Sequence, residues 1–211
     1  MPNHSKPLLY LITDRSMLPP GKNSSKLSDL IDYTTRAVDA GIDMVQIRER
    51  DLSARDLLYV ADAARAVAEG RKTLILINDR SDVAACAGAG VHLTTRSISA
   101  DVVRRAFGAS MLVGVSTHSL EEIDDAERGG ADFVVFGPVF ETESKKVYGA
   151  PAGLDALSAA TARVKIPVLA IGGINLDNFR EALDRGAAGV AAISLFARSE
   201  DLLSVVRAIK A

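Results

Sequence analysis

The chain has 211 residues, of which 48% are hydrophobic and 25% charged, enough for one large domain or two small ones. The formal net charge of −2 and the lack of a lysine and arginine cluster argue against a nucleic-acid partner. No apolar run reaches the roughly 18 to 20 residues of a membrane span, and no signal-peptide cleavage pattern follows the N-terminus, so we expect a cytoplasmic protein without a membrane partner.

Eight short apolar runs alternate with amphipathic stretches of helical period. We expect strands at 8–13, 43–48, 73–78, 91–93, 112–116, 133–137, 167–172 and 190–194. The helices expected between and after them lie at 27–40, 53–68, in the eighties, and at 99–107, 119–129, 153–162, 175–185 and 199–210. The lone cysteine, Cys86, falls in a small-residue stretch and is expected to be buried.

The strand runs are continuously apolar, which is typical of parallel strands covered on both faces. Repeated strand–helix units imply parallel strands joined by right-handed crossovers. Eight such units predict an α/β fold with a single (β/α)₈ TIM barrel over 1–211. An open doubly wound sheet is the alternative, although no GxGxxG follows the first strand.

Polar residues gather where the predicted strands end, and in a barrel this is the face that carries binding and catalysis. The candidate site residues are Gln46, Arg48, Arg50, Asn78, Asp79, Ser116, His118, Thr142, Ser144, Lys145, Gly172, Gly173, Ile193 and Ser194. Asn78 and Asp79 have an alternative role as caps of the helix that follows them.

The stretches IGGIN and AAIS end the seventh and eighth strands and predict a phosphate site. Glycine lets the backbone approach an anion closely, so we expect the phosphate to bind the backbone amides of Gly173, Ile193 and Ser194. A tight turn without a ligand is the alternative. A bulky residue at Gly173 is expected to weaken binding while leaving the fold largely intact.

The stretch GVSTHSL places His118 between the fifth strand and the following helix. We expect the strand to end at Ser116, Thr117 and His118 to lie on the rim, and Ser119 to cap the helix in a capping box with Glu122. A histidine titrates near pH 6.5, as an acid–base group requires. The alternative is a histidine that merely packs at a helix start.

Several ordered motifs resemble those of the thiamine phosphate synthase/TenI family. They are YLITD (10–14), VQIRERD (45–51), INDR (77–80), VHL (91–93), GVSTHSLEE (114–122), ADFVVFGPVFETESKK (131–146), IPVLAIGGI (166–174) and GAAGVAAIS (186–194). The resemblance covers nearly the whole chain. It implies a barrel that binds a thiazole phosphate in thiamine biosynthesis.

The synthase branch of that family joins an aminopyrimidine diphosphate to the thiazole phosphate with the help of Mg²⁺ and releases pyrophosphate. Against its pattern, Arg50 replaces a lysine, Glu141 a proline, and Ser97 the second magnesium aspartate, whereas Asp79 remains. The substitution at Ser97 matters because Mg²⁺ prefers anionic oxygen ligands. Under this interpretation Gln46, Arg48, Arg50, Asn78 and Lys145 form the diphosphate clamp.

The TenI-like branch isomerises a thiazole carboxylate phosphate without metal or cofactor, using a histidine as acid–base group. The stretches RERD, FETESKK and STHSLEE are similar to it. We therefore favour a thiazole tautomerase with His118, Arg50 and Lys145 as catalytic residues. The synthase, with Asp79 as a Mg²⁺ ligand, is the alternative, and a non-catalytic phosphate-binding regulatory barrel is a further one. Homo-oligomerisation stays open.

Overall fold

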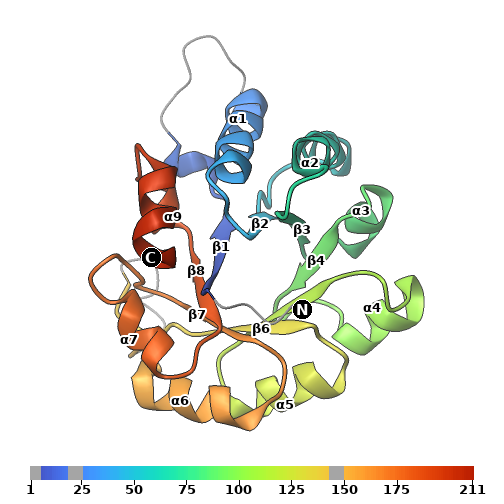
Figure 1. Ribbon diagram of the computed structural model, residues 1–211. Helices are drawn as coiled ribbons and strands as arrows, with labels where there is room; N and C mark the ends of the chain where they lie inside the picture. Colours follow the sequence, from blue (N-terminus) through green and yellow to red (C-terminus); the bar gives the residue numbers. More distant parts are fainter. Residues whose placement is uncertain (1–5, 19–25, 143–149) are drawn as a thin grey trace.

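The computed structural model describes residues 6–18, 26–142 and 150–211. Eight parallel strands form a closed barrel in which each strand pairs with its neighbours in chain order, and helices surround it (Figure 1). The strands are β1 (Leu8–Ile12), β2 (Met44–Ile47), β3 (Leu74–Asn78), β4 (Gly90–Leu93), β5 (Val113–Thr117), β6 (Phe133–Phe136), β7 (Val168–Ile171) and β8 (Gly189–Ala192). The predicted (β/α)₈ barrel is confirmed, and the open-sheet alternative is wrong because β8 pairs with β1.

Each strand is followed by a helix of the outer ring, and β8 is followed by two. The helices are α1 (Lys26–Asp39), α2 (Ala54–Ala68), α3 (Ser81–Cys86), α4 (Ala100–Phe107), α5 (Leu120–Arg128), α6 (Gly153–Arg163), α7 (Phe179–Asp184), α8 (Ser194–Ala197) and α9 (Leu202–Lys210), with a 3₁₀ turn η1 (Arg15–Met17) after β1. The short α8 was not expected. The last helix, α9, contacts α1 and so completes the ring (Figure 1).

Two apolar layers hold the barrel together. Inside it, side chains such as Tyr10, Met44, Leu76 and Phe133 are buried and fill the interior. The opposite face of each strand packs against the helices, which explains why the strand sequences are apolar on both faces. Gly114 makes room for the Phe133 ring, because a Cβ at residue 114 would lie 2.3 Å from its Cζ atom.

Three local predictions are wrong. Strand β5 continues to Thr117, which pairs with Phe136 and is buried rather than on the rim. Strand β8 ends at Ala192, because Ser194 already begins α8. Cys86 is exposed at the end of α3, next to the exposed Ala85, whereas Val83 and Ala84 form the buried face of the helix. Among the described residues, no helix is both long and apolar enough to span a membrane.

Candidate active site

The loop after β2 is anchored to the loop after β1 by the buried carboxylate of Glu49. Thr13 Oγ1 donates to Glu49 Oε1 at 2.7 Å, and Arg15 Nη1 donates to Glu49 Oε2 at 2.8 Å. The backbone N–H of Arg48 in turn donates to Thr13 Oγ1 at 2.9 Å. Glu49 is therefore occupied in holding the two loops and positions Arg48 and Arg50, its neighbours in the sequence.

Arg48 and Arg50 carry guanidinium groups without an ion-pair partner among the described side chains, although the negative charges of Asp14 and Glu49 attract that of Arg48. Neither makes a side-chain hydrogen bond or ion pair within the described residues, although Arg15 beside them is paired with Glu49 and Asp51. Burial lowers the pKa of Arg48 from its usual value, and the positive charge of Arg50 lowers it further. Two adjacent unpaired cations, one half-buried, are suited to an anionic ligand.

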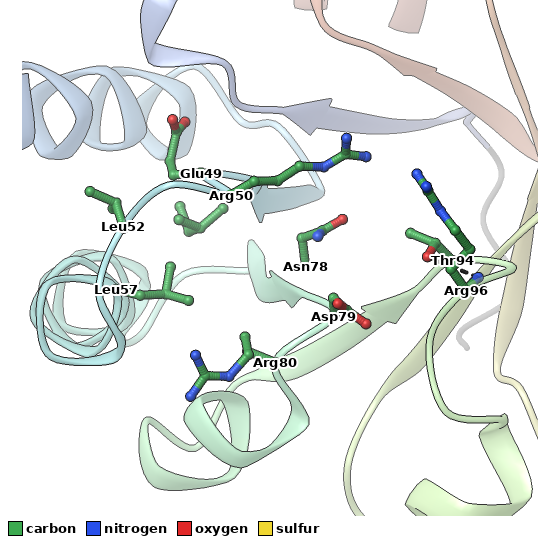
Figure 2. A pocket seen from close by; sticks show the side chains of 10 residues that line it. Glu49, Arg50, Leu52, Leu57, Asn78, Asp79, Arg80, Thr94 and Arg96 are labelled. Carbon is green, nitrogen blue, oxygen red and sulfur yellow. Dashed lines mark hydrogen bonds between the residues drawn. The ribbon is translucent and has the colours of Figure 1, made fainter.

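A cavity of about 320 Å³ lies at the carboxyl ends of β2, β3 and β4. Figure 2 shows Arg50 and Arg96 reaching over it from opposite sides, with Asn78 and Asp79 between them. Arg80 turns away and forms an ion pair with Asp82 at 2.6 Å. Arg96 follows the β4 strand end by three residues and was not among the candidate site residues predicted from the sequence. The signal that could have identified it is a cationic residue soon after a strand end, in the stretch HLTTRS.

Asp79 has an unusual backbone conformation. Its φ of 65° lies in the left-handed region, rare for a residue other than glycine and common at functional sites. Its backbone N–H donates to the carbonyl oxygen of His92 at 2.8 Å, which ties the β3 loop to β4. The capping hypothesis is wrong, because α3 begins after Arg80 without a side-chain cap.

Of the described carboxylates that line the cavity, only that of Asp79 is free for Mg²⁺, because Glu49 is paired with Arg15. Within the described ranges, no group of three or more His, Cys, Asp or Glu side chains could hold a metal ion. Ser97 Oγ instead accepts a hydrogen bond from the Thr94 backbone at 2.8 Å. Because Mg²⁺ is commonly held by one or two carboxylates together with substrate phosphates, Asp79 fits a magnesium–diphosphate complex. It does not fit a site made by protein ligands alone.

Below the barrel mouth, four polar side chains form a continuous chain of hydrogen bonds across the interior. Gln46 Nε2 donates to Tyr10 Oη at 2.8 Å, Tyr10 Oη lies 3.1 Å from His92 Nδ1, and His92 Nε2 lies 2.8 Å from Ser116 Oγ. Burial lowers the pKa of His92 to about 3, helped by the charge of Arg48, and raises that of Tyr10 above its usual range. Both are therefore neutral at pH 7. Gln46 and Ser116 were predicted, whereas Tyr10 and His92 read as ordinary strand residues.

His118 lies on the exposed rim after β5. Ser119 caps α5, and its Oγ accepts from the backbone N–H of Glu122 at 3.2 Å, as predicted. Glu122 Oε2 does not reach Ser119 but accepts from the backbone N–H of His118 at 2.6 Å and lies 3.2 Å from its Nδ1. The carboxylate therefore fixes both the turn and the imidazole.

The loops after β7 and β8 present free backbone amides. No described residue accepts a hydrogen bond from the backbone N–H groups of Gly173 and Ser194. Gly172 and Gly173 have φ values of +95° and +67°, and the loop after β6 packs over them. A Cβ on Gly173 would lie 2.3 Å from the Glu141 carbonyl oxygen, so the expectation that a bulky residue there leaves the fold intact is wrong.

The remaining predicted residues are distributed as follows. Thr142 is half-buried in the loop after β6, and Gly172 and Ile193 are half-buried at the ends of β7 and β8. Ser144 and Lys145 lie outside the described residues.

Comparisons with known proteins agree over nearly the whole chain. The family model described as thiamine monophosphate synthase matches residues 9–196. A Geobacter sulfurreducens protein named "Putative thiamine-phosphate synthase" is 44% identical over 204 residues, 96% of this chain and 92% of that protein. A thiamine-phosphate synthase of Chlorobium phaeobacteroides is 36% identical over 97% of this chain and 95% of its own length.

A solved structure gives the same result. The thiamine phosphate pyrophosphorylase of Pyrococcus furiosus superposes with a TM-score of 0.82 at 32% identity, over 96% of this chain and 93% of that one. These relatives carry synthase names, which supports the synthase alternative better than the tautomerase that we favoured from the sequence. With the family model, they show that the chain belongs to the thiamine monophosphate synthase family.

Proposed function

We propose that this protein is a thiamine-phosphate synthase that couples an aminopyrimidine diphosphate to a thiazole phosphate. The observation that carries the proposal is the set of unpaired arginines around the cavity at β2, β3 and β4. Arg50 and Arg96 line that cavity, Arg48 lies near Arg50 outside its lining, and none of the three forms an ion pair with a described carboxylate. A diphosphate supplies the negative charge that they lack.

The reaction breaks the bond between the pyrimidine methylene carbon and the diphosphate oxygen. The electron pair leaves with pyrophosphate, and the lone pair of the thiazole nitrogen forms the new carbon–nitrogen bond. Negative charge grows on the leaving oxygens, where Arg50 and Arg96 stabilise it, while positive charge grows on the pyrimidine. The free amides of Gly173 and Ser194 hold the phosphate of the second substrate on the other side of the barrel mouth.

Mg²⁺ would be held by Asp79 together with diphosphate oxygens, and it would neutralise charge on the leaving group. Because the described part of the cavity supplies one free carboxylate, Mg²⁺ is expected to bind weakly without the diphosphate. Arg50 and Arg96, which line the same cavity, supply further positive charge to the leaving group.

A specific observation favours a second candidate, the thiazole tautomerase. Glu122 lies 3.2 Å from His118 Nδ1 and orients the ring, leaving Nε2 available as an acid–base group at an exposed position. This is the arrangement of an oriented general base. Ser97 stands where the synthase pattern has a magnesium-binding aspartate, and this substitution also favours the tautomerase.

One set of assays separates the candidates. Purified protein is supplied with thiazole phosphate, aminopyrimidine diphosphate and Mg²⁺, and separately with the thiazole carboxylate tautomer alone. Formation of thiamine phosphate and pyrophosphate, sensitive to EDTA, supports the synthase. Aromatisation of the tautomer without coupling supports the tautomerase. Binding of thiazole phosphate without either product would support the non-catalytic regulatory barrel instead.

A further inference from the structure

The buried chain Gln46–Tyr10–His92–Ser116 crosses the barrel beneath the candidate active site. Its members come from β2, β1, β4 and β5, and Gln46, Tyr10 and His92 are each at most 2% exposed. Only its two ends, Gln46 and Ser116, belong to the predicted substrate site. Tyr10 and His92 connect these ends through three hydrogen bonds of 2.8 to 3.1 Å.

The placement of the Gln46 amide sets the order of donors and acceptors along this chain. Gln46 Nε2 donates to Tyr10 Oη, so the phenolic hydrogen is free for the next contact. If His92 Nδ1 also donated to Tyr10, that hydrogen would have no acceptor among the described residues at a fully buried position. Tyr10 therefore donates to His92 Nδ1, and the ring hydrogen of His92 is on Nε2.

The same order continues to Ser116. His92 Nε2 donates to Ser116 Oγ at 2.8 Å, so the serine oxygen is an acceptor toward the interior. The serine hydrogen is then left to donate toward the barrel mouth. At the other end, Gln46 uses its amide nitrogen for Tyr10, which leaves its carbonyl oxygen as an acceptor. One end is thus a donor and the other an acceptor.

We propose that Tyr10 and His92 are positioning residues that fix Ser116 as a hydrogen-bond donor and Gln46 as an acceptor for the aminopyrimidine substrate. This inference rests on the proposed synthase function. An aminopyrimidine has ring nitrogens that accept and an amino group that donates, so it complements these two ends. As pyrophosphate leaves and the ring becomes cationic, its amino hydrogens bind more strongly to the Gln46 carbonyl. The effect of the chain is therefore larger in the transition state than in the ground state.

Two buried tyrosines allow a matched test. Tyr10→Phe removes the hydroxyl that links Gln46 to His92. Tyr33→Phe removes a hydroxyl from α1 that is also buried but has no hydrogen-bond partner among the described residues. We expect Tyr10→Phe to lower kcat for thiamine phosphate formation about 10- to 100-fold while KM for thiazole phosphate changes little. Tyr33→Phe should keep both constants. A Tyr10→Phe enzyme with normal kcat would overturn the proposal.

A double-mutant cycle tests whether His92 acts through Ser116. His92→Asn and Ser116→Ala are each expected to lower kcat, and their combination should be little worse than Ser116→Ala alone. Multiplication of the two separate effects would show that His92 does not act through Ser116, and the proposal would fall. The melting temperature of each variant shows whether loss of activity follows loss of the fold.

A measurement without substrate separates this inference from the proposed function. In ¹⁵N-histidine-labelled protein at pH 7, the resonance that disappears in His92→Asn should report a neutral ring with its hydrogen on Nε2. If the protein is an active synthase but carries the His92 hydrogen on Nδ1, the proposed hydrogen-bond order is overturned and the proposed function is not. If the tautomer is as expected but the protein forms no thiamine phosphate, the proposed function is overturned. The substrate assigned to the hydrogen-bond chain is then overturned with it.

Discussion

Replacing Gly173 by alanine should destabilise the barrel much more than the same replacement at Gly70. Both glycines lie in the left-handed region, at φ +67° and +71°. A left-handed conformation costs an alanine about 1 to 2 kcal/mol, so this contribution is shared. The two sites differ in their surroundings, because a Cβ at Gly70 meets no atom within 4 Å.

At Gly173, the added Cβ would lie 2.3 Å from the Glu141 carbonyl oxygen and 2.8 Å from the Phe140 Cβ. These are backbone-linked atoms that cannot rotate away, so the loop after β6 must shift. Overpacking of this kind costs about 1 to 3 kcal/mol beyond the backbone effect. For a chain of this size, each kcal/mol lowers the melting temperature by about 2 to 4 °C. Gly173→Ala should therefore melt about 2 to 12 °C below Gly70→Ala.

Thermal unfolding followed by circular dichroism gives this difference directly. Calorimetric titration with thiazole phosphate should also show weaker binding to Gly173→Ala, because its backbone amide belongs to the proposed phosphate site, and unchanged binding to Gly70→Ala. Equal melting temperatures for the two variants would refute the packing argument. Unchanged phosphate affinity in Gly173→Ala would remove that amide from the site.

Three further predictions concern the chemistry. Asp79→Ala should abolish EDTA-sensitive thiamine phosphate formation. Ser97→Asp should lower the Mg²⁺ concentration needed for half-maximal activity, since it adds a second carboxylate. An unchanged Mg²⁺ dependence in both variants would contradict the metal assignment. Arg96→Ala should raise the Kd for pyrophosphate in calorimetry about 10-fold or more, whereas Arg55→Ala, at an exposed position of α2, should not. Equal Kd values for the two variants would exclude Arg96 from the anion site of the cavity. His118→Asn should lower the kcat for tautomerisation about 10²- to 10⁴-fold and affect the synthase reaction much less. A strong loss of thiamine phosphate formation in this variant would place His118 in the synthase reaction.

Several features of the site could be predicted because they depend on local sequence. The ends of barrel strands are recognisable from apolar runs, so the sequence predicts the positions of Arg48, Arg50, Asn78 and Ser116 at the barrel mouth. Ser119 was recognised as a helix cap because its spacing to Glu122 is local. The errors at Thr117 and Ser194 are one or two residues long, since pairing with a neighbouring strand and the start of a four-residue helix decide where a strand ends.

The sequence by itself determined the α/β class, because eight apolar runs separated by amphipathic helices can bury both faces of a parallel sheet either in a closed barrel or in a sheet covered on both sides. The pairing of β8 with β1 decided for the barrel. Only the tertiary structure decided which polar groups meet. Gln46 and Tyr10 are 36 positions apart, Tyr10 and His92 82, and His92 and Ser116 24. Their contact depends on the register of closure around the barrel, a property of all eight strands together. The same closure pairs Glu49 with Arg15 and leaves Arg50 without an ion-pair partner in the part of the chain that the structure describes. The charge of the cavity therefore follows from packing rather than from composition.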